Sequence, residues 1–325
     1  MIISRTPLRI SFAGGGTDLP SYYREHGGGA VTSAAIDRFV HVVVNEKFDR
    51  SVRVAYSRTE NVEHFGDLQH GLVREAMRVT GVTEALEVHT IADIPSEGTG
   101  LGSSSSLTVG LLNALYAHRG ILKDPAELAE EACRIEIDTL GGTLGKQDQY
   151  IAAFGGIQFF EFRPDDTVRA SPIPLTGADR HAFSEHLSLY YTGITRQAQG
   201  ILKNQDARTS QNLESLARIR GLATRCRDAF LARDWKGVGQ ALDEGWRLKR
   251  SLSEGITSPQ IDEAYGRAMA AGAWGGKITG AGGGGFFLVV HPPARSAQIE
   301  SALSPMRRLP VRIHPEGSRI LFVQR

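Results

Sequence analysis

The sequence predicts an α+β protein built from two lobes, and three observations lead to this prediction. The chain has 325 residues, of which 41% are hydrophobic, and this length suits two domains of about 150 residues each. The first half mixes strand-like and helix-like segments, whereas the second half is mainly helical and ends in short strands. The 37 glycines, a share above the average of about 7%, cluster between these segments. We place the boundary near Pro174, which gives lobes over residues 1–174 and 175–325.

Four segments of the N-terminal lobe are expected to form strands of one sheet. Their residues are β-branched or alternate in polarity, and turn-forming residues bound them: residues 8–12, 39–47, 51–56 and 86–91. A helix is expected from Ser104, because apolar residues recur at four-residue intervals: Leu107, Leu111 and Leu115. The next helix, running to about residue 138, begins with a capping-box pattern: Asp124, Pro125 and Glu127.

The C-terminal lobe is expected to follow a turn-rich stretch over residues 163–179. Its helical segments are 195–207, 212–233, 236–253 and 260–271. Its strands are 277–279, 286–291, 311–314 and 319–323. The glycine clusters therefore lie in loops between packed elements, which excludes a collagen-like or low-complexity chain.

Charge and cysteine content exclude several classes of function. The chain has 37 Lys and Arg against 36 Asp and Glu, without a basic run interleaved with aromatics, so nucleic acid is not an expected partner. Neither a leader-like apolar core nor the roughly 18 apolar residues of a membrane span are found, so we expect a soluble protein that is not exported. Cys133 and Cys226 lie too far apart for a disulfide framework or a zinc site, and they fit a reducing cytoplasm.

The Gly/Ser-rich loop over residues 95–106 is a candidate anion site. It follows the strand at 86–91 and leads into the helix that begins at Ser104. Glycines let the backbone approach a ligand, and a helix N-terminus presents unpaired N–H groups. For the loop alone, a flexible linker is the alternative interpretation. The loop is not a Walker motif, because no Gly-Lys-Ser/Thr follows, and it is not a dinucleotide-binding motif, because the glycine spacing differs. The candidate phosphate contacts are Pro95, Gly98, Gly100, Leu101, Gly102, Ser103, Ser104, Ser105 and Ser106.

Three segments together resemble the sequence motifs of the GHMP kinases. Residues 7–18, 95–106 and 277–285 are similar to the first, second and third motifs of that family, in the usual order. The resemblance implies an N-terminal lobe like domain 2 of ribosomal protein S5 and a C-terminal ferredoxin-like lobe. ATP, Mg²⁺ and a small-molecule acceptor would lie between the lobes, with Gly282 and Gly283 of the third motif on the acceptor side.

The resemblance also implies roles for two carboxylates. Asp148, in the glycine-rich segment 141–149, would lie beside the acceptor hydroxyl. Glu136 would face Mg²⁺, with Ser104 or a neighbouring serine as a second metal contact. Phosphoryl transfer needs this kind of positioning and charge neutralisation rather than covalent chemistry. The alternative for Glu136 is a solvated helix face.

The first motif would supply a cation and a carboxylate. Arg9 is expected near Asp148 and the γ-phosphate, with a surface arginine as the alternative. Asp18 would accept hydrogen bonds from acceptor hydroxyls, and its alternative is a cap for the segment after the glycines. Charge-assisted hydrogen bonds of this kind favour a polyol acceptor. The other expected acceptor-side residues of this turn are Gly15, Gly16 and Thr17.

The Gly-Gly-Gly-Thr-Asp form of the first motif resembles the heptose and fucose kinase branch of the family. Further stretches resemble the heptose phosphate kinases of that branch: residues 67–76, 191–198, 246–252 and 256–262. Their resemblance implies transfer of the γ-phosphate to the anomeric hydroxyl of D-glycero-D-manno-heptose 7-phosphate, on the route to GDP-linked heptose and surface polysaccharide. Arg196 is the candidate for the sugar's own phosphate, because arginine offers a bidentate fork; an exposed helix residue is its alternative. A fucokinase-like or other sugar 1-kinase, an inactive sugar sensor and a structural protein remain alternatives. A homodimer is left open.

Overall fold

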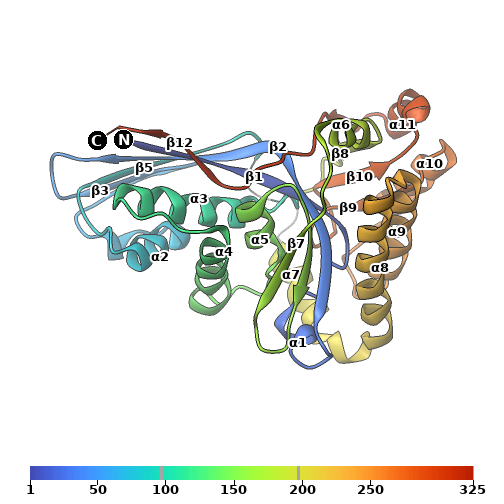
Figure 1. Cartoon of the computed structure of the whole chain (residues 1–325), viewed down its shortest axis with the longest axis horizontal. Helices are drawn as coiled ribbons and strands as arrows, with labels where there is room; N and C mark the ends of the chain where they lie inside the picture. Colours follow the sequence, from blue (N-terminus) through green and yellow to red (C-terminus); the bar gives the residue numbers. More distant parts are fainter. Residues whose placement is uncertain (96–97, 196–197, 325) are drawn as a thin grey trace.

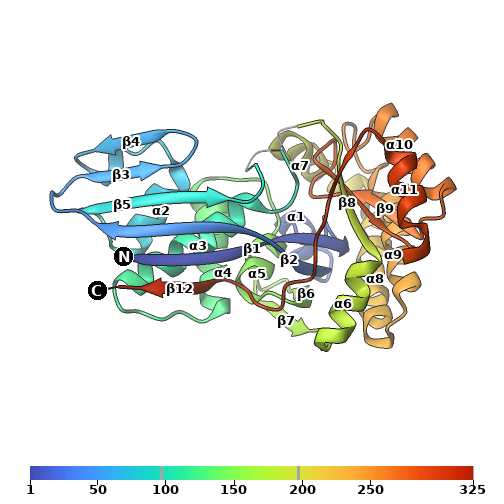
Figure 2. The ribbon, with the colours of Figure 1, turned by 90° about the horizontal axis from the view of Figure 1, so that it is seen from above.

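Two sheets with surrounding helices make up the part of the chain that the computed structural model describes, residues 1–95, 98–195 and 198–324. The larger sheet has the strand order β12-β1-β2-β5-β3-β4, with β6 and β7 attached through β2 (Figures 1 and 2). Its strands are β1 (Ile2–Ala13), β2 (Gly29–Glu46), β3 (Val52–Ala55), β4 (Thr59–Val62), β5 (Leu86–Ala92), β6 (Ile157–Phe162), β7 (Val168–Pro172) and β12 (Arg319–Val323).

The long strand β2 joins the two ends of this sheet. It pairs with β1 along most of its length, with β6 near its start and with β5 near its end. The β1–β2 register shifts after Pro7 and again after Ser11, and such bulges bend a strand and increase its twist. Strand β1 therefore bends as it approaches the glycines of the first motif.

The smaller sheet has the order β11-β8-β10-β9, and all its neighbours are antiparallel. Along the chain, its strands and the helices between them follow the pattern β-α-β-β-α-β. A spatial order of fourth, first, third and second strand is the ferredoxin-like arrangement, so this part of the predicted fold is confirmed. The strands are β8 (Leu187–Tyr191), β9 (Gly275–Ile278), β10 (Phe286–Val290) and β11 (Arg307–Leu309).

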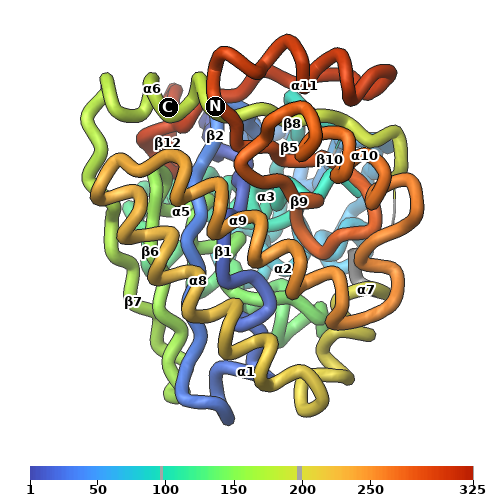
Figure 3. Tube along the Cα trace, turned by 90° about the vertical axis from the view of Figure 1, so that its right-hand side faces the viewer, coloured from blue at the N-terminus to red at the C-terminus, as the bar shows by residue number. Residues whose placement is uncertain are grey.

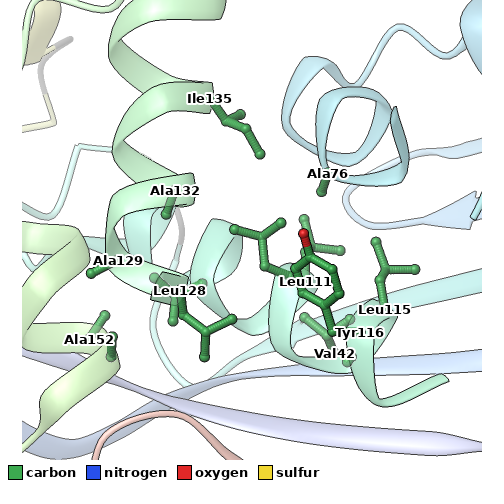
Figure 4. Packing of buried hydrophobic residues seen from close by; sticks show 14 of the residues in the cluster. Val42, Ala76, Leu111, Leu115, Tyr116, Leu128, Ala129, Ala132, Ile135 and Ala152 are labelled. Atoms are coloured by element: carbon green, nitrogen blue, oxygen red, sulfur yellow. The ribbon is translucent and has the colours of Figure 1, made fainter. Parts of the chain in front are cut away.

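One group of helices covers a face of the larger sheet. Leucines of α3 and α4 meet alanines of α4 and α5 and Val42 of β2 in a buried cluster, part of which Figure 4 shows. The apolar stripe predicted for α3 is buried there, with Leu111 and Leu115 fully covered. The helices of this half are α1 (Pro20–Tyr23), α2 (Gly71–Thr80), α3 (Ser103–His118), α4 (Pro125–Cys133) and α5 (Gln147–Phe154).

Two of the remaining helices, α8 and α9, pack between the two sheets. Helix α8 contacts β1 and β2 of the larger sheet, and α9 contacts β1 of that sheet as well as β9 and β10 of the smaller one (Figure 3). A buried apolar core lies between the sheets and these helices. In it, three aromatic rings pack edge to face with centroids 4.9 to 5.6 Å apart: Phe12, Phe183 and Phe230. The helices are α6 (Gly177–Glu185), α7 (Ala198–Ala207), α8 (Leu213–Ala232), α9 (Trp235–Lys249), α10 (Pro259–Ala270) and α11 (Ser296–Leu303).

Several local predictions are confirmed, and others are wrong. The capping box of Asp124 and Glu127 is present, and α4 continues into a π-helical turn over Arg134–Thr139. The predicted strand over 311–314 is wrong, because its described residues make only one isolated bridge, Ile36 with Ile313. The stretch 163–179 is not all turn, since it contains β7 and the start of α6. Elements that the sequence prediction omitted are α1, α2, α5, α6, α11, β4, β6, β7, β8 and β11.

The last strand lies beside the first. Strand β12 pairs with β1, and the Gln324 N–H donates to the Met1 carbonyl, so the two ends of the described chain lie side by side (Figure 1). The chain thus returns to the larger sheet, and a boundary near residue 174 stays a prediction. Within residues 1–95, 98–195 and 198–324, the helices are all too short or too polar to cross a membrane.

Candidate active site

The three glycine-rich segments meet around one pocket of about 230 Å³. The first motif and the segment before α5 form one side, the phosphate loop another, and the third motif with α7 and α9 the rest. The lining residues are Arg9, Ser11, Gly15, Gly16, Asp18, Leu19, Gly98, Thr99, Gly100, Leu101, Gly102, Ser103, Ser104, Ser105, Leu144, Gly145, Gln147, Asp148, Leu202, Gln205, Lys249, Thr279, Gly280, Ala281, Gly282 and Gly284.

The phosphate loop has the geometry of an anion site. Gly98, Gly100 and Gly102 all have positive φ, at 69°, 71° and 78°, a region that favours glycine. Helix α3 begins directly after Gly102, and no described side chain caps its first turn. The first N–H groups of this helix therefore lack intrahelical partners and face the pocket with the positive end of the helix dipole.

The third motif packs directly against this loop. A Cβ added at Gly100 would lie 2.6 Å from the Thr279 carbonyl oxygen, and one added at Gly280 would lie 2.8 Å from the Gly100 Cα. Backbone thus meets backbone at a distance that a side chain cannot occupy. The glycines of both motifs are required for the close approach that closes this side of the pocket.

Arg9 and Asp148 form a bidentate ion pair at the pocket wall. Arg9 Nε donates to Asp148 Oδ1 at 2.7 Å, Nη2 donates to Oδ2 at 2.5 Å, and Nη1 donates to the Gly100 carbonyl at 2.5 Å. Because Arg9 is only 5% exposed, the surface-arginine alternative is wrong. The pair links the first motif to both the phosphate loop and the start of α5.

Glu136 lies behind the pocket wall rather than on a solvated face. Its carboxylate accepts hydrogen bonds from Ser105 Oγ at 2.7 Å, from Thr108 Oγ1 at 2.6 Å and from the Gln149 amide. Burial raises the pKa of Glu136 to about 6, against the lowering effect of these three donors. The carboxylate reaches the pocket through Ser105, which lines it.

The donor set fits a magnesium ion that is held mainly by phosphate oxygens. Mg²⁺ usually binds through one or two carboxylates, several waters and substrate phosphates rather than an all-protein cage. Glu136 would supply one carboxylate if it exchanged one of its hydrogen bonds, and the exposed Ser104 would supply a hydroxyl at the same helix end. Among the described residues, no group of three or more His, Cys, Asp or Glu side chains is placed so that it could hold a metal ion by itself.

Asp18 is buried beside Gln147 at the pocket wall. It accepts hydrogen bonds from the Gly16 N–H at 2.9 Å and from Gln147 Nε2 at 3.0 Å. Burial raises the pKa of Asp18, and the negative charge of Asp148 adds to that rise. A Cβ at Gly145 would lie 1.9 Å from Asp18 Oδ2, so Gly145 makes room for this carboxylate. Asp18 therefore both caps the glycine turn and faces the pocket.

The hydroxyls of two residues that we predicted at the ligand donate hydrogen bonds to backbone carbonyls. Thr17 Oγ1 donates to the Gly14 and Ala30 carbonyls, and Ser106 Oγ donates to the Pro7 carbonyl. Both side chains are fully buried, and contacts of Thr17 and Ser106 with ligand stay predictions. Pro95 and Gly283 also lie outside the pocket lining, whereas the other described candidates except Glu136 line it. Arg196 lies outside the described residues.

Lys249 is a pocket residue that the sequence prediction missed. Its Nζ donates to the Gly280 carbonyl at 2.6 Å, and the side chain is 6% exposed. Burial lowers the pKa of Lys249 to about 8, and the charge of Asp18 opposes this effect. The signal was present in the sequence, because Lys249 follows buried Leu242 and Trp246 at helical spacing. A lysine on an apolar helix face needs a polar environment or a ligand.

Family models match both halves of the chain. The GHMP kinases N terminal domain matches residues 68–156, and the GHMP kinases C terminal domain matches residues 226–306. The D-glycero-alpha-D-manno-heptose 7-phosphate kinase of Campylobacter jejuni is 31% identical over 316 residues, covering 93% of each chain. The L-fucokinase/L-fucose-1-P guanylyltransferase of Bacteroides fragilis is 28% identical over 94% of this chain but only 36% of its own length.

Solved structures share the whole architecture. A D-glycero-D-manno-heptose 1-phosphate kinase from Bacteroides thetaiotaomicron matches with a TM-score of 0.83 and 25% identity, over the full length of both chains. The galactokinase of Lactococcus lactis matches with a TM-score of 0.78 over 98% of this chain. Its identity is 18%, so that likeness concerns the fold alone.

Proposed function

Because this chain belongs to the GHMP kinase family and is an ATP-dependent sugar kinase, we propose that it phosphorylates the anomeric hydroxyl of D-glycero-D-manno-heptose 7-phosphate. The product would be the 1,7-bisphosphate, for GDP-linked heptose and surface polysaccharide. The observation that carries the proposal is the Arg9–Asp148 pair, which lies between the phosphate loop and the buried Asp18. The relative at 31% identity, named as a heptose 7-phosphate kinase, supports this acceptor.

We assign Asp148 to the acceptor hydroxyl and Arg9 to the transferring phosphoryl group. A carboxylate is a weak base toward an alcohol until the new P–O bond is largely formed. Asp148 would therefore orient the hydroxyl and accept its proton late. Arg9 would stay in contact with the γ-phosphate oxygens, over which negative charge is spread in the transition state. The partly buried ion pair would hold both side chains at fixed positions before the reaction.

Glu136 and Ser104 would hold Mg²⁺ together with the phosphates. The ion would neutralise charge on the β- and γ-phosphates. The hydrogen bond from Ser105 holds the Glu136 carboxylate against the first turn of α3. The loop glycines would let the backbone N–H groups reach the phosphate oxygens.

Asp18 and Lys249 would face the acceptor sugar. The carboxylate of Asp18 would accept hydrogen bonds from hydroxyls, which favours a polyol. Lys249 makes a single hydrogen bond to protein, to the Gly280 carbonyl, within the described residues. Its remaining donors suit an anionic oxygen of a phosphorylated acceptor. Arg196 keeps its proposed role at the sugar's own phosphate.

An ADP-release assay across a sugar panel tests the proposal. The panel is mannose, fucose, galactose, sedoheptulose 7-phosphate, and D-glycero-D-manno-heptose with and without its 7-phosphate. We expect the highest kcat/KM with the heptose 7-phosphate. Equal rates without the 7-phosphate would favour a fucokinase-like or other sugar 1-kinase. No ADP from any sugar would favour the inactive sensor, against which the intact Arg9–Asp148 pair argues.

A further inference from the structure

Buried polar atoms without protein partners gather on one side of the pocket. Within the described residues, these are Ser11 Oγ, Gln147 Oε1 and both amide atoms of Gln205, while Ser103 Oγ is a further unpartnered atom of the lining on the phosphate loop. A buried polar atom left without a partner costs about 1–3 kcal/mol, and folded proteins keep few of them. Several such atoms on one pocket wall indicate that a ligand with hydroxyl or amide groups completes their hydrogen bonding.

Gln205 is the most deeply placed of this set. It lies in the last turn of α7, is 2% exposed, and lines the pocket. A Cβ added at Gly16 would lie 2.4 Å from Gln205 Nε2, so the amide rests against the backbone of the first motif. The amide therefore has a fixed place at the pocket wall and does not extend into solvent.

The other two unpartnered groups face the same glycine turn. A Cβ at Gly15 would lie 3.5 Å from Gln147 Nε2 and 3.7 Å from Ser11 Oγ. Gln147 uses its Nε2 to donate to Asp18, which leaves its carbonyl oxygen free. Two amides, a hydroxyl and a carboxylate thus converge on the Gly15 and Gly16 backbone.

This set of groups matches a polyol better than other acceptors. The Gln205 amide offers two donors and one carbonyl acceptor, and the Gln147 carbonyl and Ser11 hydroxyl add further acceptors. Each sugar hydroxyl both donates and accepts one or more hydrogen bonds, so neighbouring hydroxyls can satisfy both kinds of group. A purely anionic group would satisfy the donors alone and leave the carbonyl oxygens unpaired.

We propose that Gln205 binds ring hydroxyls of the acceptor sugar and determines which sugar the enzyme accepts. Gln147 Oε1 and Ser11 would bind neighbouring hydroxyls. The inference rests on the proposed function and names the residue that selects the substrate of that site. A site built to hydrogen-bond a hydroxyl rejects an analogue that lacks it, because its own buried groups are then left unpaired.

The test compares Gln205→Met with a matched control, Asn204→Met, at an exposed position of the same helix. Methionine keeps the length of glutamine but cannot replace its hydrogen bonds. We expect Gln205→Met to raise the acceptor KM about tenfold for each hydrogen bond lost, with unchanged affinity for a fluorescent ATP analogue. Asn204→Met should behave as wild type. Gln205→Asn, which keeps the amide but shortens it, covers the case in which methionine impairs folding.

Monodeoxy analogues of the best acceptor identify the contact. Removal of the hydroxyl that Gln205 binds should cost the wild type about tenfold in kcat/KM and cost Gln205→Met nothing further. An unchanged acceptor KM, or equal penalties in both proteins for every analogue, would overturn the inference. Failure of the wild type with every sugar would overturn the proposed function instead, and calorimetric binding of the same sugars to both proteins would then test Gln205 without turnover.

Discussion

Replacement of Asp148 by asparagine tests the centre of the proposed site. The amide oxygen can keep the hydrogen bond from Arg9 Nε, now 2.7 Å long, but the NH₂ group would face Arg9 Nη2 across 2.5 Å, where two donors meet. Loss of this charge-assisted bond beside a buried guanidinium should cost about 1–3 kcal/mol of stability. Because the carboxylate also orients the acceptor hydroxyl, turnover should fall by about 10²–10⁴.

Three measurements separate these effects. Thermal unfolding reports the stability loss, a fluorescent ATP analogue reports nucleotide binding, and ADP release at saturating acceptor reports kcat. The control is Glu87→Gln, which alters the 2.8 Å ion pair of Arg53 and Glu87 in the larger sheet, outside the pocket lining. We expect ATP binding to persist in Asp148→Asn while kcat is lost, and Glu87→Gln to keep its kcat. A kcat within threefold of the wild type in Asp148→Asn would refute the role assigned to this carboxylate.

Three further changes have defined outcomes. Gly100→Ala should weaken ATP binding and stability more than Gly141→Ala, since both glycines have positive φ but only the first would clash with Thr279; equal losses would contradict the packing argument. Lys249→Met should raise the KM for a phosphorylated acceptor. Because the pKa of Lys249 is lowered to about 8, its ammonium is lost as pH rises, so the wild-type KM should rise from pH 7 to 9 while that of Lys249→Met stays flat. Glu136→Gln should raise the Mg²⁺ concentration needed for half-maximal activity, and an unchanged requirement would exclude it as a metal ligand.

Local sequence signals predicted the elements that carry their own pattern. Helix α3 has a regular leucine stripe after a glycine loop, and α4 has a complete capping box. Strand β6 was missed because its run Ile157–Phe162 is almost fully buried and lacks alternation. The false strand over 311–314 alternates in polarity, yet its backbone pairs only at Ile313. Alternation reports a half-buried segment and does not require a strand partner.

Most of the contacts that form the candidate site join residues far apart in the chain, so local sequence patterns could not predict them. Arg9 and Asp148 are 139 residues apart in the chain, and their predicted proximity rested on the resemblance to a family. Lys249 carried a local signal, because its charge interrupts an apolar helix face. Gln205 carried none, since glutamine is common on solvated helices, and only the fold shows that this one is buried at the pocket wall.

The charge balance of the pocket bears on its metal requirement. The charged side chains among the described lining residues are two cations and two carboxylates: Arg9, Lys249, Asp18 and Asp148. A triphosphate adds several negative charges, and the N-terminus of α3 offsets only about half a unit. Two further positive charges from Mg²⁺ would therefore stabilise the bound nucleotide strongly. We expect chelation with EDTA to reduce turnover to background and added Mg²⁺ to restore it, whereas turnover that survives chelation would mean that these side chains and the helix end neutralise the phosphates alone.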